Sequence, residues 1–194
     1  MNLSIGENMK QLKFPNKLYK VIYADPPWKY SSRKYQDNGR IFLKLEKQYN
    51  TMKIQDIMKL PVNQISDEDC ACFLWVTDSH LNEGMQVLSA WGFRYVTIAF
   101  VWVKKTSQGN TCVNYAPWTL KSTEICILGI KGSMTKYKVN NKVRALVESP
   151  RTIHSKKPNE VRNRIADLFG DVPKIELFAR EKVNGWDCWG NQAP

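Results

Sequence analysis

An unbroken apolar run, Cys70–Val76, constrains the fold of this 194-residue chain more than any other feature. A run of strand length without polar positions leaves no face for solvent, which is typical of a parallel strand covered on both faces. It is followed by the helix N-cap residues Thr77–Ser79 and by a helical apolar stripe that extends to Trp91. A buried strand that leads into an amphipathic helix predicts an α/β sheet.

The same alternation of strand and helix patterns continues along the chain. Pro61, Gly92 and Gly170 stand where helices are expected to end. We expect strands at Tyr19–Ala24, Cys70–Val76, Phe93–Lys104, Glu124–Ile130 and Pro173–Ala179, and helices at Ile54–Leu60, from Thr77 through Trp91 and from Pro158 to Gly170. Length and alternation together predict one domain, residues 1–194, with a mostly parallel sheet and helices on both faces.

Composition narrows the class of protein. Lys and Arg total 29 against 18 acidic residues, a net charge of +11. Such an excess suits a polyanionic partner such as nucleic acid, because Lys and Arg release counterions from phosphates. No run approaches the ~20 apolar residues of a membrane span, and the N-terminus lacks the apolar core of a signal peptide. We therefore expect a soluble protein with no membrane partner, located in the cytoplasm, or in the nucleus of a eukaryotic cell.

The chain has five cysteines, an odd number, and only two histidines, His80 and His154. No spacing among them resembles a zinc site, so we predict no metal and reduced thiols that are mostly buried. We also expect the side chains of Cys70 and Cys72, which belong to one strand, to point to opposite faces of the sheet.

The sequence Asp25-Pro26-Pro27-Trp28 follows the first expected strand. The prolines lack an N–H group and have a fixed φ, so they end the strand and hold their carbonyl groups in set directions. Asp25 offers an acceptor for an amine, and Trp28 offers a flat face for a ring. The combination suits a site that holds the exocyclic amino group of a base. An ordinary strand-ending turn with Trp28 in the core is the simpler alternative.

These four residues resemble the Asp-Pro-Pro-Trp signature of the MT-A70 family of S-adenosylmethionine-dependent adenine-N6 methyltransferases. Further segments match that family in the same order: Phe73–Thr77, Trp102–Lys104, Glu124–Gly132, His154–Glu160, Lys174–Arg180, and Gly185-Trp186 through Gly190-Asn191-Gln192. The resemblance runs from about Tyr19 to Gln192 and implies a single-domain, Rossmann-like methyltransferase fold.

The resemblance implies transfer of a methyl group from S-adenosylmethionine to N6 of adenine, with S-adenosylhomocysteine as the product. Asp25 and the Pro26 carbonyl would accept the two N6 hydrogen bonds, so that the weakly nucleophilic nitrogen exposes its lone pair. A carboxylate with a pKa of about 4 cannot remove an amine proton before attack, so we assign Asp25 to positioning and polarising N6. Pro27 completes the catalytic turn. Trp28 is the first choice for stacking on a base flipped out of its helix.

For the cofactor, the resemblance implies contacts from Asp25 and from the C-terminal part of the chain. Lys157 stands just before an expected helix, where its charge adds to the helix dipole and suits a carboxylate. The other implied cofactor residues are Glu176, Phe178, Arg180, Asn191 and Gln192. The chain has no Gly-x-Gly-x-x-Gly loop, and the segment Ser4–Pro15 offers only Glu7 where the family often has an Asp.

For the nucleic acid, the candidate contacts are Trp28, the lesser stacking candidates Tyr49 and Trp118, Lys121 and Glu124, where Glu124 either pairs with Lys157 or meets the target base. The expected target-contacting loops are three long segments rich in basic or aromatic residues, about 29–50, 105–122 and 133–155. DNA is the expected substrate, because nothing in the chain resembles an added RNA-reading module.

Three alternatives remain open. The first is an adenine-N6 methyltransferase that acts on RNA, and the second is a catalytically silent partner subunit that only binds nucleic acid. The third, ranked last, is an N4-cytosine methyltransferase. Whether it works alone, as a homodimer or with a partner subunit is also left open.

Overall fold

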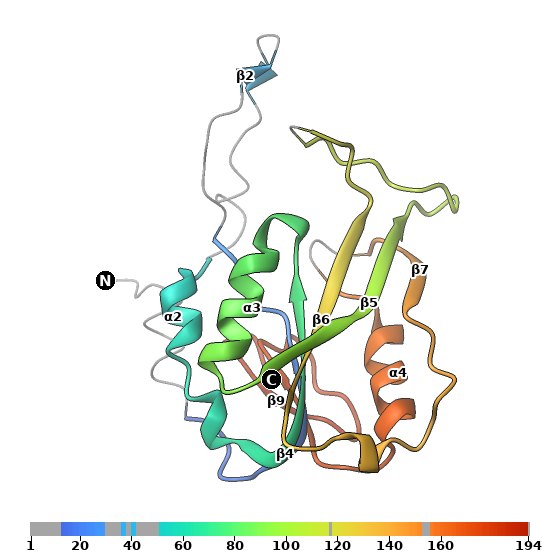
Figure 1. The fold of residues 1–194 in the computed structure, drawn as a ribbon. Helices are drawn as coiled ribbons and strands as arrows, with labels where there is room; N and C mark the ends of the chain where they lie inside the picture. The colour runs from blue at the N-terminus through green and yellow to red at the C-terminus, as the bar shows by residue number, and fades with distance from the viewer. Residues whose placement is uncertain are drawn as a thin grey trace.

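A seven-stranded sheet forms the centre of the molecule (Figure 1). The computed structural model describes residues 13–29, 51–116, 118–152 and 156–193, together with the backbone of 36–37 and 40–41. The strands are β1 (Tyr19–Ala24), β2 (Gln36–Asp37), β3 (Arg40–Ile41), β4 (Ser66–Val76), β5 (Arg94–Lys105), β6 (Thr123–Lys131), β7 (Leu146–Pro150), β8 (Lys174–Leu177) and β9 (Asp187–Trp189). The helices are α2 (Ile54–Met58), α3 (Leu81–Ala90) and α4 (Asn159–Phe169), and short 3₁₀ turns lie at Val62–Gln64, Asp78–His80 and Thr135–Tyr137.

The sheet is mixed and mostly parallel, in the order β7-β5-β6-β4-β1-β8-β9. β1 lies between β4 and β8 and is parallel to both. β5 pairs in parallel with β7, and β8 with β9. β6 runs antiparallel to both of its neighbours, β4 and β5. The prediction of an α/β fold with a mostly parallel sheet is confirmed, and β6 is the departure from it.

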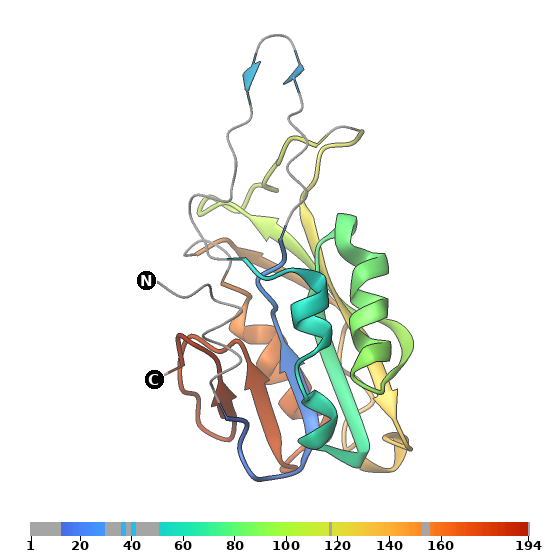
Figure 2. The ribbon, with the colours of Figure 1, turned by 90° about the vertical axis from the view of Figure 1, so that its left-hand side faces the viewer.

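Helices cover both faces of this sheet, as expected (Figures 1 and 2). On one face, Leu88 of α3 and Trp91 at its end are fully buried in the core layer that contains Leu74 of β4. On the other face, Val161 and Ile165 of α4 pack into a second core layer. β4 is therefore buried on both sides, which explains why its sequence reads as a continuous apolar run.

Two strands of the sheet were not expected from the sequence. β7 includes Glu148 and Pro150, and β9 has three residues, so neither shows an apolar strand pattern. They form because β5 and β8 offer backbone groups along the edges of the sheet.

The expectation for Cys70 and Cys72 is wrong. Both side chains lie in the core layer beneath α2 and α3, because residues two apart in a strand share a face. The five cysteines are free thiols. Within the described residues, no cluster of three or more His, Cys, Asp or Glu could hold a metal ion. No helix in that part of the chain is long and apolar enough to cross a membrane.

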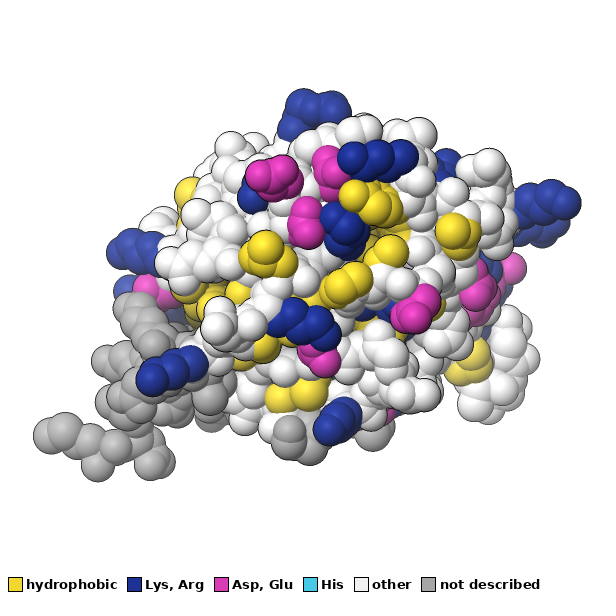
Figure 3. All heavy atoms as spheres, turned by 90° about the horizontal axis from the view of Figure 1, so that it is seen from below, with side chains coloured by type: hydrophobic (Ala, Val, Ile, Leu, Met, Phe, Trp, Pro, Cys, Tyr) yellow, Lys and Arg dark blue, Asp and Glu magenta, His cyan; other side chains and the backbone are white. Residues whose placement is uncertain are grey.

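The direction of β6 decides where the basic segment 133–145 lies. β6 ends at the edge of the sheet where the parallel strands begin. There the Ser133 N–H donates to the Asp69 carboxylate at 2.7 Å. The expected loop 133–155 is thus divided: 133–139 lies at this amino edge, 140–145 leads up to the middle of β5, β7 runs along the second half of β5, and 151–152 lie at the opposite edge. Seen from the amino edge, basic and acidic side chains intermingle (Figure 3).

Candidate active site

The carboxyl ends of the parallel strands meet at one edge of the sheet, which we call the carboxyl rim. β1, β4 and β8 end there at Ala24, Val76 and Leu177. β5 ends at the same edge, and β6 begins there because it runs in the opposite direction. Ligands of open α/β sheets bind beyond such an edge. Residues that follow these strands, or that open β6, therefore share one site.

The residues Asp25–Trp28 form the turn that follows β1. Strand pairing of β1 ends at Ala24, as the two prolines require. The Trp28 N–H donates to the Pro26 carbonyl at 2.9 Å. Met52 N–H donates to the Pro27 carbonyl at 2.8 Å, and Lys29 N–H donates to the Met52 carbonyl at 3.1 Å. The chain that leaves the site after Trp28 therefore returns to it at Met52.

Four alternating charges form a connected chain at the carboxyl rim. Lys157 Nζ lies 2.8 Å from each carboxylate oxygen of Asp25. The same ammonium lies 3.2 Å from Glu124 Oε2, and Lys104 Nζ pairs with Glu124 Oε1 at 2.5 Å. The four side chains are between 12% and 22% exposed, so their charges interact through the protein more than through bulk water. The rim thus holds a compensated cluster, Asp25–Lys157–Glu124–Lys104, which we call the charge cluster.

Burial and ion pairing oppose each other in the charge cluster. Burial lowers the pKa of Lys157, but Asp25 and Glu124 outweigh it and hold that pKa above its usual value. Burial raises the pKa of Glu124, yet Lys157 and Lys104 together hold it below the usual value. For Asp25, burial outweighs its ammonium partner, and the pKa is raised. Lys157 is therefore a stable cation, and Asp25 is the carboxylate most sensitive to losing its partner.

Trp28 lies deeper than a freely accessible stacking residue would. It is 6% exposed, and its indole N–H donates to the Trp75 carbonyl at 2.9 Å. Its ring stacks on His80 with centroids 5.7 Å apart. Trp75 in turn donates its indole N–H to the Tyr23 hydroxyl at 2.6 Å. Most of the Trp28 side chain therefore belongs to the core, as in the alternative of a strand-ending turn. Its ring forms a rigid wall beneath the carboxyl rim.

Glu176 of β8 is held by an arginine that the sequence interpretation did not consider. Arg162 of α4 is buried, and its Nε lies 2.8 Å from Glu176 Oε2. Arg162 also reaches Glu181 at 3.3 Å, and Lys156 pairs with Glu181 at 2.9 Å. Burial raises the pKa of Glu176 in spite of Arg162. This second charge network joins the start of α4 to the chain that follows β8.

The loop after β8 lies against the end of β9. Phe178 has a φ of 62°, a left-handed conformation that residues other than glycine rarely adopt. Its ring meets the Trp189 ring edge-on at 5.9 Å, and the Ala179 N–H donates to the Trp189 carbonyl at 3.1 Å. A Cβ atom on Gly190 would lie 2.9 Å from Phe178 Cα, so the close approach of these two backbones requires glycine.

This contact brings the remaining C-terminal candidates toward the rim. Asn191 and Gln192 follow Gly190 directly and are exposed. Arg180 is also exposed, and its positive charge lowers the pKa of Asp25, although less than Lys157 does. The structure therefore brings Asp25, Lys157 and Arg180 within electrostatic reach of one another.

The nucleic-acid candidates are distributed unevenly around the rim. Glu124 belongs to the charge cluster and pairs with Lys157. Lys121 pairs with Asp78 at 3.0 Å, beside the end of β4. Trp118 is 93% exposed in the segment between β5 and β6. Tyr49 and most of the expected loop 29–50 lie outside the described residues.

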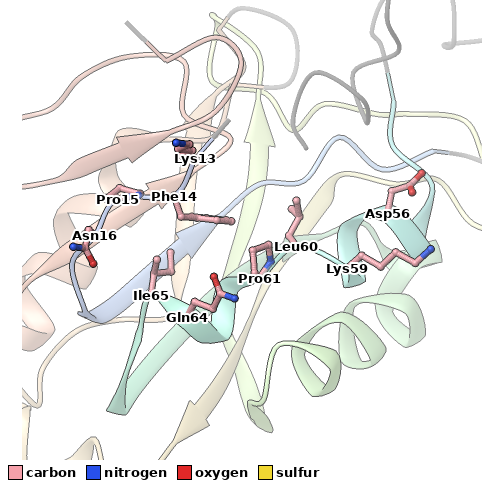
Figure 4. A pocket seen from close by; sticks show the side chains of 10 residues that line it. All are labelled: Lys13, Phe14, Pro15, Asn16, Asp56, Lys59, Leu60, Pro61, Gln64 and Ile65. Atoms are coloured by element: carbon pink, nitrogen blue, oxygen red, sulfur yellow. The ribbon is translucent and has the colours of Figure 1, made fainter. Parts of the chain in front are cut away.

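A hollow of about 500 Å³ lies away from the charge cluster, between the segment before β1 and the connection from α2 to β4 (Figure 4). Its floor includes Phe14, Leu60 and Ile65, and Lys13 and Lys59 stand at its margin. None of the residues of the charge cluster lines it. This hollow and the charge cluster are therefore different places.

A family model for MT-A70 matches residues 19–192 of the chain. The chain belongs to the MT-A70 family of adenine-N6 methyltransferases. The match begins at the first residue of β1 and ends at Gln192, so it includes every element of the carboxyl rim. MT-A70 enzymes use S-adenosylmethionine.

Individual MT-A70 relatives agree with this assignment. The type II methyltransferase M.MunI of Mycoplasma sp is 34% identical over 94% of this chain and 81% of its own length. The N(6)-adenosine-methyltransferase subunit METTL3 of Danio rerio is 30% identical over 90% of this chain, which spans 28% of that relative. An MT-A70-like N(6)-adenosine-methyltransferase of Drosophila melanogaster is also 30% identical over 90% of the chain, which spans 27% of it.

The sequence interpretation missed two residues of these charge networks. Lys104 was matched to the family without a role, and Arg162 was read as part of a helix. The available signal was a charged residue inside an otherwise apolar element, which must find a partner when it is buried. Its partner could not be named, because Lys104 and Glu124 are 20 residues apart and Arg162 and Glu176 come from different elements.

Proposed function

We propose that this chain transfers a methyl group from S-adenosylmethionine to N6 of adenine in DNA, on a single-domain Rossmann-like methyltransferase fold. The observation that carries the proposal is the pairing of Asp25 with Lys157 at the carboxyl rim, within a chain of the MT-A70 family. Similarity to a type II methyltransferase over 81% of that enzyme's length favours DNA as the polymer.

The donor set at the rim fits the charges of the cofactor. The carboxylates of Asp25 and Glu124 suit its sulfonium and ammonium groups, and Lys157 with Arg180 suits its carboxylate. Glu176, oriented by Arg162, suits the ribose hydroxyls. The ring of Phe178 and the amides of Asn191 and Gln192 suit the adenosine portion. When bound, S-adenosylmethionine supplies an electrophilic methyl group.

The residues of the turn act on the adenine. Asp25 keeps acceptor capacity while it is paired with Lys157, because a carboxylate has about four lone-pair positions. The Pro26 carbonyl uses one lone pair for the Trp28 N–H and has a second for an N6 hydrogen. With both N6 hydrogens held, the nitrogen lone pair is free to form the N–C bond as the S–C bond breaks. The alkylated nitrogen is acidic enough to release its proton to Asp25 or to water.

The intact charge cluster also bears on the alternative of a silent partner subunit. A chain that only binds nucleic acid has no need of two half-buried carboxylates and two half-buried ammoniums beside the base site, because ion pairs shielded from water add little to stability. The pairing of Lys157 with both Asp25 and Glu124 therefore supports the enzyme over the silent subunit.

The test is an isosteric change of Asp25. Asp25→Asn keeps the shape of the side chain and removes its charge, so we expect the methylation rate to fall by about 100-fold or more. Transfer from labelled cofactor is measured on duplex DNA, single-stranded DNA and single-stranded RNA, and the product is identified by nucleoside mass spectrometry. Asp67→Asn, which breaks a peripheral pair with Lys20, is the matched control. Wild-type transfer by Asp25→Asn, or a product other than N6-methyladenine, refutes the proposal.

A further inference from the structure

The described residues between β5 and β6, 106–116 and 118–122, stand out beyond the carboxyl rim as the two arms of a hairpin (Figures 1 and 2). Its apolar side chains are unusually exposed: Val113 by 55%, Tyr115 by 78%, Trp118 by 93% and Leu120 by 59%. Burying a side chain of this size stabilises a protein by about 1.5–3 kcal/mol, and these side chains forgo most of that gain. An exposed group of this kind marks an interaction surface.

Backbone hydrogen bonds hold the hairpin in a defined shape. Asn114 and Lys121 exchange two N–H to carbonyl bonds at 2.8 Å. Cys112 N–H donates to the Lys104 carbonyl at 2.7 Å, and Lys104 N–H donates to the Ser122 carbonyl at 2.8 Å. The Lys121 side chain is tied to Asp78 at the end of β4. The cost in entropy of ordering the hairpin is therefore met during folding and not on binding.

The two ends of the hairpin lie at the charge cluster. Lys104 precedes the hairpin and Glu124 follows it, and these two residues pair with each other at 2.5 Å. The site that would receive the adenine, at Asp25, therefore lies beside the base of the hairpin. Residues 104–122 contain three lysines and no acidic residue, and each lysine pairs with a carboxylate outside the hairpin: Lys104 with Glu124, Lys105 with Glu148 and Lys121 with Asp78. The attraction for a phosphate backbone therefore comes from the net charge of +11 of the whole chain, and the hairpin contributes its exposed rings.

We propose that Trp118 stacks on an unpaired nucleobase adjacent to the target adenine, so that the enzyme prefers target adenines in unpaired or locally opened DNA. This inference rests on the proposed function and adds a second contact to it, outside the pocket that receives the adenine. A tryptophan offers a face to any base, so the contact selects for an unpaired strand more than for a particular sequence.

The experiment measures binding of labelled DNA, with S-adenosylhomocysteine present to prevent turnover. The probes are a single strand of about 20 nucleotides, its perfect duplex and the same duplex with a short mismatched bubble at the adenine. We expect Trp118→Ala to weaken binding of the single strand and the bubble by about 5- to 100-fold and to leave the perfect duplex nearly unchanged. Trp118→Phe retains a ring and recovers most of the affinity.

Leu120→Ala is the matched control, because it removes exposed apolar surface from the same hairpin without removing a ring. Its binding should equal that of the wild type. Quenching of tryptophan fluorescence by the single strand should be smaller in Trp118→Phe than in the wild type. Equal affinity of Trp118→Ala and wild type for all three probes overturns the inference. So does a sedimentation result in which Trp118→Ala dissociates a dimer but binds DNA normally, since the hairpin would then join two copies.

The inference and the proposed function can fail separately. Trp118-dependent binding without any methyl transfer leaves the stacking contact in place and refutes the enzyme. Methyl transfer to adenine in DNA, together with binding that does not depend on Trp118, supports the enzyme and refutes the stacking contact.

Discussion

Lys157 is the residue on which the charges of the carboxyl rim depend. It contacts both oxygens of Asp25 and one oxygen of Glu124, and it stands immediately before Pro158, at the start of α4. If Lys157 is lost, Glu124 still pairs with Lys104, whereas Asp25 has no second ammonium group within ion-pair distance among the described residues. A change at Lys157 therefore affects Asp25 more than it affects Glu124.

We predict that Lys157→Met shifts the acid limb of the pH–rate profile. Asp25 must be ionised to accept the N6 hydrogen bond, so activity falls as the pH drops through its pKa. That pKa is already raised by burial, and removing Lys157 raises it further. The acid limb should therefore move to higher pH by about one to two units. Lys156→Met, which breaks the pair with Glu181, should leave the limb where it is. Superimposable profiles for Lys157→Met and wild type contradict the prediction.

At the level of elements, the amino edge of the sheet is held by an ionised side chain that takes no part in the site. Asp69 of β4 accepts the Ser133 N–H at 2.7 Å and pairs with Lys136 at 2.7 Å, so it ties the turn after β6 to β4. Gly132 in this turn has a φ of 62°, and a Cβ atom there would collide with the Asp69 carboxylate. Lys136 and the Ser133 N–H lower the pKa of Asp69 to about 2.

Asp69→Asn should therefore destabilise the fold in a pH-dependent way. The folded-state pKa lies below the unfolded value of about 4, so the contribution of Asp69 is present above pH 4 and disappears as the pH falls toward 2. The variant should unfold at lower urea concentration than the wild type at pH 7, and the difference should shrink across this window. Asp167→Asn, at an exposed position of α4, serves as a control for the general effect of losing one acid. A difference that persists undiminished at pH 2 argues against the assignment.

The elements that the sequence predicted well are those whose pattern is local. β1 matches the expected Tyr19–Ala24, and α3 and α4 begin and end close to the expected residues. β7 and β9 were not predicted, because they form by pairing with a neighbouring strand and their own residues show no strand pattern. The expected loop 133–155 was divided for the same reason, since the direction of β6 places 133–139 at the amino edge and β5 pairs with 146–150.

For the whole molecule, the excess of positive charge indicates a DNA-binding surface only when the positions of the basic residues are known. Arg151 follows β7 at the carboxyl rim, and Lys138 lies at the amino edge; both are exposed. Only a residue near the bound phosphates releases a counterion when DNA binds.

We predict that DNA affinity falls steeply with salt and that the two edges contribute differently. Each contacted phosphate contributes about −0.7 to −0.9 to the slope of log K against log salt concentration. Arg151→Gln should reduce the steepness by about one such contact, and Lys138→Gln should leave it unchanged. The slopes are measured by titrating single-stranded and duplex DNA over a range of salt concentrations. An equal loss of slope in both variants would place the DNA elsewhere.

By itself the sequence determined that the chain alternates strands and helices, that Asp25-Pro26-Pro27-Trp28 closes a buried strand, and that the chain resembles MT-A70 enzymes. These features are local, because they follow from residue spacing, from the missing N–H of proline and from the order of short motifs. Only the tertiary structure decided which charges meet. Asp25 and Lys157 are 132 residues apart in the chain, and a 2.8 Å contact between them exists because parallel strands end at one edge. It also decided that Trp28 is largely buried while Trp118 is exposed, since burial depends on neighbours that the chain brings from elsewhere.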